Sequence, residues 1–307
     1  MVSTMRLADL HEDLAYASMR ADVINGNAQS SISMLRNFEH ALVFAAVFPR
    51  VELRGVGKTA RPALMKLLLE QVRFYLELER AGLVNIVRRE GDLRPGINLL
   101  LSIEGADVLG DAGDLLLLRE LGVRAIGITW NEDNRFASSC MTRKDYGLTG
   151  EGEELVRLAN ELGVIVDVAH ASKRTVLDVA SISKKPVIAS HANAAALKGH
   201  KRNLDDEEIE AIVRTGGVIG VTAIRETLPS PTIQGMVDNL KYIGESFGWG
   251  HVAVGTDMLG IDETPSGFEN ILMISKLVEA VGHGDELWEN PLRVVNETLR
   301  ADRVKNT

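Results

Sequence analysis

The chain has 307 residues, of which 45% are hydrophobic and 25% are charged, and its formal net charge is −9. This ordinary apolar fraction excludes a disordered or collagen-like chain, and the negative charge, with no basic run, excludes a typical nucleic-acid-binding surface. The single cysteine, Cys140, excludes an intramolecular disulfide and a thiolate metal cluster.

The N-terminal segment, MVSTMRLADLHEDL, carries several charges and no apolar core, so no signal peptide is predicted. No uninterrupted apolar run reaches the roughly 18 residues that a membrane-spanning helix needs. We therefore expect a cytoplasmic protein that has no membrane partner.

Short apolar segments recur along the chain, and most of them are apolar on both faces. This pattern is typical of parallel strands that are buried on two sides. The predicted strands cover residues 6–10, 41–47, 97–102, 125–129, 164–169, 187–190, 218–221 and 252–255.

Helical patterns lie between most of these strands, with apolar residues on one stripe and glycines at several ends. The predicted helices cover residues 61–82, 150–162, 205–215, 232–247 and 267–281. The C-terminal segment, residues 290–307, is polar and charged at its tip, so we expect it to fray beyond a final helix.

Strands that alternate with helices indicate parallel βαβ units and the α/β class. Eight such strands in a chain of this length favour a closed (β/α)₈ TIM barrel, with residues 1–307 as one domain that ends in C-terminal helices. The alternative is an open, doubly wound sheet, and the lack of a G-x-G-x-x-G motif after the first strand weakens it.

Ligand-type side chains follow several predicted strands, where a barrel places its catalytic groups. They are His11, Asp13, Glu104, His170, His191 and Asp257. Taken singly, each has an ordinary explanation, such as a core histidine or a helix cap. Together, imidazoles and carboxylates suit Zn²⁺ or a similar ion. The five of these residues other than Asp257 suffice as ligands for two ions that share a carboxylate. Glu104 is the natural bridge because a carboxylate offers two oxygens.

The sequence resembles the membrane (renal) dipeptidase family, zinc dipeptidases of the amidohydrolase superfamily. Six segments carry this resemblance in the family's order. They are DLHEDL (9–14), SIEG (102–105), GLTGEGEELVRLANELGVIVDVAHAS (147–172), PVIASHANAAAL (186–197), HKRNLDDEEIEAIVRTGGVIGV (200–221) and HVAVGTDMLG (251–260).

The resemblance implies a role for each matching residue. His11 and Asp13 would hold one zinc, His170 and His191 the other, and Glu104 would bridge both, taking part in catalysis. A hydroxide between the ions would attack the peptide bond. The resemblance implies that Arg202 binds the substrate's terminal carboxylate, and arginine suits this role because its guanidinium can bind a carboxylate through two hydrogen bonds. The alternative is that Arg202 forms a surface salt bridge with Asp205 or Asp206.

Asp257 would contact the free amino group and carry protons. This agrees with our interpretation of its position, because an acid beside a metal-bound hydroxide is a candidate proton shuttle.

The chain departs from the family after the fourth predicted strand, where T-H-N/S becomes Thr129-Trp130-Asn131. Trp130 and Asn131 are therefore expected to face the substrate, but an indole can only donate a hydrogen bond and cannot shuttle protons. Met258 follows Asp257 in a segment that reads F-D-G in the family, so one acidic side chain is missing.

We therefore expect a two-zinc dipeptidase that acts on small peptides and tolerates a D-residue at the C-terminal position. The first alternative is a metal-dependent hydrolase of non-peptide amides or lactams, and the second is a non-catalytic metal- or peptide-binding descendant. The sequence leaves the oligomeric state undetermined, with a homodimer open.

Overall fold

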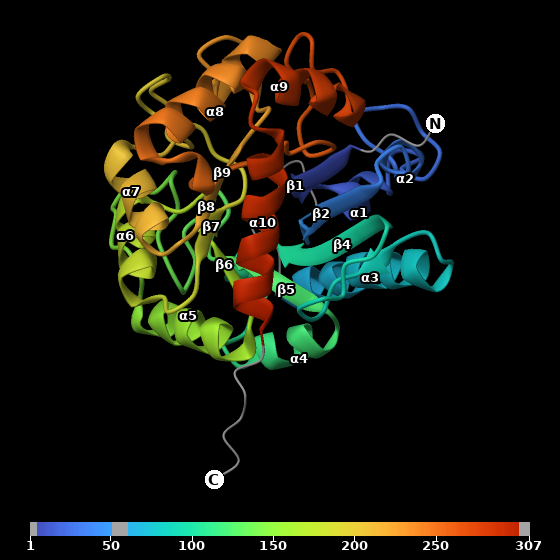
Figure 1. Cartoon of the computed structure of the whole chain (residues 1–307). Coiled ribbons are helices and arrows are strands. Elements are labelled where there is room, and N and C mark those ends of the chain that lie inside the picture. Colours follow the sequence, from blue (N-terminus) through green and yellow to red (C-terminus); the bar gives the residue numbers. More distant parts are fainter. Residues whose placement is uncertain (1–4, 51–60, 301–307) are drawn as a thin grey trace.

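The computed structural model describes residues 5–50 and 61–300. Eight parallel strands form a barrel surrounded by helices, as Figure 1 shows, in the order β1-β2-β4-β5-β6-β7-β8-β9. These strands are β1 (Arg6–Glu12), β2 (His40–Val47), β4 (Gly96–Ile103), β5 (Val123–Gly127), β6 (Ile165–Asp167), β7 (Val187–Ala189), β8 (Val218–Val221) and β9 (Val252–Val254). All eight coincide with predicted strands, and the TIM-barrel prediction is confirmed. A short additional strand, β3 (Asn85–Ile86), pairs with β4 and was not predicted.

The sheet nearly closes where its first and last strands meet. Beyond the end of β9, Met258 forms a parallel bridge with Glu12 of β1. The Asp13 amide donates to the Met258 carbonyl at 3.0 Å, and the Asp257 amide donates to the His11 carbonyl at 3.0 Å. The closing hydrogen bonds therefore lie among the predicted site residues themselves.

The helices cover the outside of the barrel and one of its ends (Figure 1). They are α1 (Leu14–Ala17), α2 (Ile32–Leu35), α3 (Arg61–Arg80), α4 (Asp114–Glu120), α5 (Gly150–Leu162), α6 (Lys173–Ile182), α7 (Asp206–Arg214), α8 (Ile233–Phe247), α9 (Ile274–Val281) and α10 (Gly284–Leu299). Four short 3₁₀ segments lie in the described loops: Ala106–Val108, Arg225–Thr227, Trp249–His251 and Ile271–Met273.

Local sequence explains where several helices begin and end. Thr149 caps α5 by accepting the Gly152 amide, and Gly163 ends it in the left-handed conformation that glycine adopts without strain. A capping box of Asp205 and Glu208 begins α7. The predicted helix 267–281 is shorter in the structure, because its regular part, α9, begins at Ile274.

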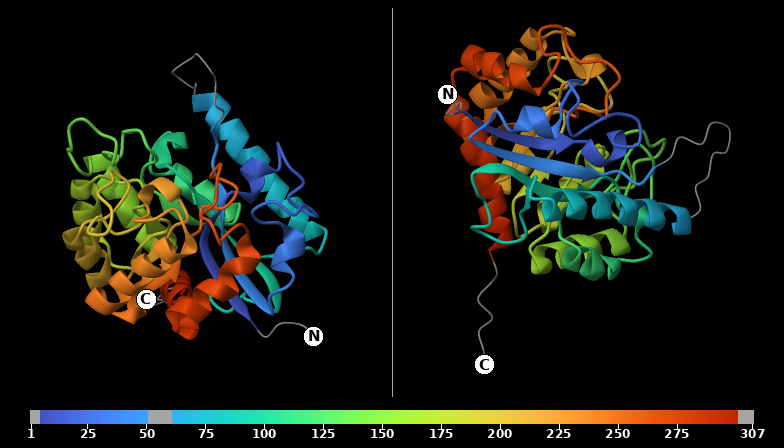
Figure 2. Two further views of the ribbon diagram at one scale, coloured as in Figure 1. Left: turned by 90° about the horizontal axis from the view of Figure 1, so that it is seen from above. Right: turned by 90° about the vertical axis from the view of Figure 1, so that its right-hand side faces the viewer.

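Helix α10 corrects the expectation that the chain frays from residue 290. It continues to Leu299 and lies across one end of the barrel (Figures 1 and 2). There Trp288, Val294, Val295 and Leu299 pack with the apolar residues that fill the barrel interior. Burial of this apolar stripe stabilises the helix. Residues 301–307 lie outside the described residues.

Among the described residues, no helix has both the length and the apolar character needed to cross a membrane.

Candidate metal centre

All six predicted ligand and shuttle residues lie at the carboxyl end of the barrel, opposite α10. His11 lies within β1 near its end, Asp13 follows that strand, and the others follow β4, β6, β7 and β9. His170 and Asp257 have φ values of 65° and 62°, the left-handed region that side chains other than glycine rarely adopt. Such backbone strain concentrates at functional sites.

His11, Asp13 and Glu104 form one group of ligand atoms. His11 Nε2 lies 3.5 Å from Asp13 Oδ2 and 3.6 Å from Glu104 Oε2. The sequence predicted that His11 and Asp13 point the same way along an extended strand. They do converge, but Asp13 lies beyond the end of β1, at the N-cap of α1.

Glu104, His170 and His191 form a second group, which shares Glu104 with the first. Glu104 Oε1 lies 3.0 Å from His170 Nε2 and 3.6 Å from His191 Nε2. The two oxygens of Glu104 therefore face different groups, as a bridging carboxylate would.

The donor atoms are of the kind that hold divalent cations. His170 Nδ1 lies 2.8 Å from Asn131 Oδ1, and His191 Nδ1 lies 2.8 Å from Ser190 Oγ. Because the Nδ1 atoms donate to these oxygens, both Nε2 atoms carry lone pairs, yet they face each other at 2.9 Å. A cation held by both Nε2 atoms would satisfy them.

His11 shows the same need for a cation. Within the described part of the chain, neither of its ring nitrogens has a hydrogen-bond partner, and Asp13 Oδ1 also has none. All three atoms are buried, and such unpaired polar atoms are costly. Metal ligation through Nε2, the ring nitrogen that faces Asp13 and Glu104, would satisfy that atom.

The charges of the site shift its pKa values in different directions. Burial alone would lower the pKa of His11, but the carboxylates of Glu104 and Asp13 outweigh it and raise that pKa. Burial, reinforced by the Arg202 charge, lowers the pKa of His170 to about 3 and also lowers that of His191. The imidazoles of His170 and His191 are thus neutral at physiological pH, as metal ligands must be.

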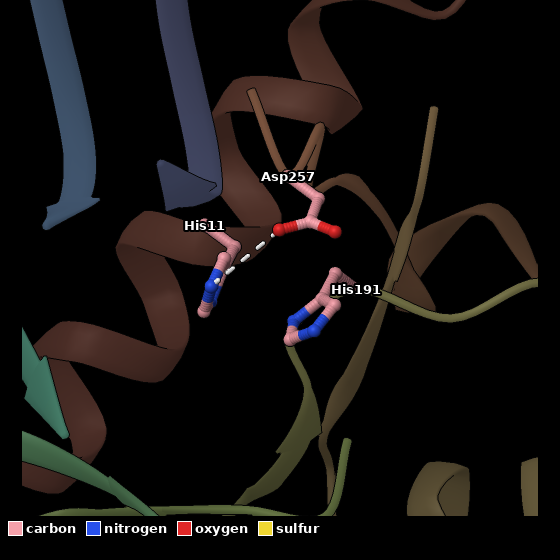
Figure 3. A group of neighbouring side chains, drawn as sticks. All are labelled: His11, His191 and Asp257. Carbon is pink, nitrogen blue, oxygen red and sulfur yellow. Dashed lines mark ion pairs between the residues drawn. The ribbon is translucent and has the colours of Figure 1, made fainter. Parts of the chain in front are cut away.

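Asp257 faces the first group. Its Oδ1 lies 3.8 Å from His11 Nε2, and Figure 3 shows it with His11 and His191 around a shared space. Burial, together with the charges of Asp13 and Glu104, raises its pKa well above the ordinary value. A carboxyl with a raised pKa takes up a proton more readily than an ordinary aspartate does, and such shifts are typical of groups that transfer protons.

Arg202 lies in a loop beside the site and is buried. Its Nη2 donates to the His191 carbonyl at 3.2 Å. The alternative salt bridge of Arg202 with Asp205 or Asp206 is absent from the described residues, in which Lys173 pairs with Asp205 at 2.7 Å.

Trp130 forms part of the wall beside His170, with their ring centroids 6.0 Å apart. The Arg50 guanidinium lies over the indole at 4.3 Å and pairs with Asp107 at 3.0 Å. Asn131, predicted to contact substrate, is placed behind His170 by its hydrogen bond to Nδ1. A substrate contact by Asn131 stays a prediction.

Sequence reasoning missed Asp9 and Asp167, two fully buried acids behind the site. Each accepts hydrogen bonds from the neighbouring strand end, at Thr256 and Ser190 respectively. The sequence offers one indication of these contacts, because Thr256 and Ser190 directly precede Asp257 and His191.

The chain is similar in sequence to known proteins. A dipeptidase of Schizosaccharomyces pombe, described as uncharacterized, is 34% identical over 66% of this chain and 53% of its own. The chain spans about half the length of the curated relatives it matches.

Solved structures share the fold. The probable dipeptidase PvdM from Pseudomonas aeruginosa aligns with a TM-score of 0.86 at 21% identity, over 96% of each chain. A metallopeptidase from Rhodobacter sphaeroides, solved with a phosphinate mimic of the dipeptide L-Ala-D-Ala, aligns with a TM-score of 0.84 at 21% identity, over 96% of this chain and 100% of its own. The profile of the membrane dipeptidase family (peptidase family M19) matches residues 1–307, and the chain therefore belongs to this family of metallopeptidases.

Proposed function

We propose that this protein is a dipeptidase that uses two divalent metal ions, with zinc as the expected metal. The observation that carries the proposal is the pair of ligand groups that share Glu104. His11 and Asp13 would hold one ion, His170 and His191 the other, and Glu104 would contact both. Bound ions of this kind lower the pKa of a water molecule and polarise a carbonyl oxygen.

The protein's own side chains would orient the substrate and move the proton. Arg202 would bind the terminal carboxylate and so restrict the enzyme to short peptides. Asp257 would accept the proton of the attacking water at a carboxylate oxygen and pass it to the leaving amine. The distance of 3.8 Å between its Oδ1 and His11 Nε2 supports this role.

Tolerance of a D-residue at the C-terminal position is part of the proposal. It is supported by family membership and by the L-Ala-D-Ala mimic bound to the Rhodobacter sphaeroides protein of the same fold. Trp130 keeps a second candidate open, hydrolysis of non-peptide amides or lactams, because its indole cannot replace a histidine in proton transfer.

A substrate panel with metal-reconstituted protein tests the proposal. We expect hydrolysis of L-Ala-L-Ala and L-Ala-D-Ala, and little hydrolysis of Ala-Ala-Ala. Preference for an acylated amine or a lactam would favour the second candidate. Full metal occupancy with no turnover of any of these compounds would indicate a metal-binding protein without catalysis.

Location and assembly complete the proposal. We propose one barrel domain over residues 1–307, located in the cytoplasm, and the single cysteine supports that compartment. A homodimer is the assembly to be tested by light scattering.

A further inference from the structure

Asp9 connects the two strand ends that meet where the barrel closes. Its Oδ1 accepts the backbone amides of His11 at 3.1 Å and Thr256 at 2.8 Å. Its Oδ2 accepts the Thr256 hydroxyl at 2.6 Å. Both Asp9 and Thr256 are fully buried. We call this arrangement the Asp9 clamp.

Asp167 repeats this arrangement between β6 and β7. Its Oδ1 accepts the backbone amides of Ala169 at 2.9 Å and Ser190 at 2.9 Å. Its Oδ2 accepts the Ser190 hydroxyl at 2.6 Å. This is the Asp167 clamp, and it uses a serine where the first clamp uses a threonine.

Each clamp presents one half of the candidate centre. In the Asp9 clamp, the aspartate lies two residues before His11, and its hydroxyl partner directly precedes Asp257. In the Asp167 clamp, the aspartate lies three residues before His170, and its hydroxyl partner directly precedes His191.

The clamps are needed because several strands end before the site. Strands β6, β7 and β9 stop at Asp167, Ala189 and Val254, so regular pairing within these strands does not extend to the ligand residues that follow. Each aspartate supplies hydrogen bonds that fix the chain beyond those ends. Hydrogen bonds to a charged acceptor are stronger than neutral ones.

The Asp167 clamp also selects a tautomer of His191. Because Ser190 donates its only hydroxyl proton to Asp167, its oxygen must accept a proton from His191 Nδ1. The Nε2 atom of His191 then keeps a lone pair that points at His170 and Glu104. The carboxylate thus sets which nitrogen can bind a metal, two hydrogen bonds away.

We propose that Asp9 and Asp167 are positioning residues, each of which orients one half of the centre without touching substrate or metal. The Asp9 clamp holds His11 and Asp257, and the Asp167 clamp holds His170 and His191. This inference rests on the proposed metal centre for its functional meaning.

Asparagine substitutions at Asp9 and Asp167 test the two halves of the candidate centre separately. Asp167→Asn keeps the acceptor for the backbone amides, but its new N–H groups donate to the Ser190 hydroxyl oxygen. The hydroxyl proton then turns to His191 Nδ1, and the ring proton moves to Nε2. In the metal-free protein, ¹⁵N spectra should show His191 in the Nε2–H form, whereas it is in the Nδ1–H form in the wild type.

Calorimetric titration of the metal-free protein with Zn²⁺ gives the second readout. Asp167→Asn should weaken one of two binding events by about 10- to 100-fold, the range for groups that orient metal ligands, and leave the other unchanged. Asp9→Asn should weaken the other event and shift the His11 resonances instead. The matched control is Asp92→Asn, because Asp92 accepts two backbone amides in a loop before β4, at the far end of the barrel.

Equal weakening of both events by each variant, or an unchanged His191 tautomer in Asp167→Asn, would overturn the inference. Ser190→Thr and Thr256→Ser keep the hydroxyls and should retain wild-type spectra and affinities. The tautomer measurement needs no metal, so it tests the Asp167 clamp even if the wild-type protein binds no zinc. Failure of the wild type to bind zinc would count against the proposed function alone.

Discussion

Gly260 lies against the carboxylate of Asp13. A Cβ atom on Gly260 would overlap Asp13 Oδ2 and lie 2.7 Å from Asp257 Oδ1. The absence of a side chain at this position therefore lets the two carboxylates occupy the site together.

Substitution of Gly260 tests this relationship. Gly260→Ala should displace Asp13 and Asp257, because the added Cβ would lie within 2.7 Å of a carboxylate oxygen of each, and metal content and kcat should both fall. The backbone of Gly260 is not in the left-handed region, so the fold should survive. Gly250→Ala is the control, since nothing lies within 4 Å of a Cβ there. Normal metal content in Gly260→Ala would contradict the argument.

Metal stoichiometry follows from the two ligand groups. Elemental analysis of reconstituted protein should give close to two ions per chain. His170→Ala should reduce that ratio toward one, because a metal site rarely retains its ion when one of its few protein ligands is missing. A ratio near zero in the wild type after reconstitution would exclude the binuclear centre.

Replacement of Arg202 should affect substrate binding more than folding. Arg202→Met removes the guanidinium but keeps much of the side-chain volume, so we expect a raised KM for dipeptides and a melting temperature close to that of the wild type. The wild-type enzyme should also hydrolyse a dipeptide amide poorly, because the amide lacks the carboxylate. Equal hydrolysis of the amide and the free acid would show that Arg202 has another role.

Asp257→Asn tests proton transfer. The amide preserves size and shape but cannot accept a proton, so kcat should fall by roughly 10²- to 10⁴-fold, the usual contribution of general acid–base catalysis. Metal content and melting temperature, measured on the same preparation, should stay near those of the wild type. Turnover close to wild type at full occupancy would remove Asp257 from the mechanism.

Glu208 should make stability depend on pH. Burial raises its pKa from 4.5 to about 7, so between these values the unfolded chain loses this proton while the folded protein keeps it. Its contribution therefore lowers the free energy of unfolding as pH rises through this window.

Comparison with a neutral side chain isolates this contribution. Glu208→Gln removes the titration and can still accept the Asp205 amide of the capping box. We measure the free energy of unfolding of both proteins with urea. The value for the variant minus the value for the wild type should be larger at pH 8 than at pH 5. The same stability difference at both pH values would show that Glu208 ionises normally in the folded protein.

The sequence alone identified the barrel and the residues at its carboxyl end. A short segment that is apolar on both faces, such as residues 218–221, indicates each strand. Local signals such as Gly163 indicate where helices end. These signals depend on residues that are adjacent in the sequence, so they can be recognised without any knowledge of the fold. The placement of His170, His191 and Asp257 after such strands was sufficient to predict that they meet.

Only the tertiary structure decided how those residues are held. Asp9 meets Thr256 across 247 positions of sequence, and Asp167 meets Ser190 across 23, because closing the barrel brings their strands together. Asn131 likewise takes its place behind His170 through a contact between loops. The stability of α10 up to Leu299 also depends on the barrel end that it covers. Sequence periodicity records which face of an element is buried, whereas hydrogen-bond partners and tautomers depend on elements distant in the chain.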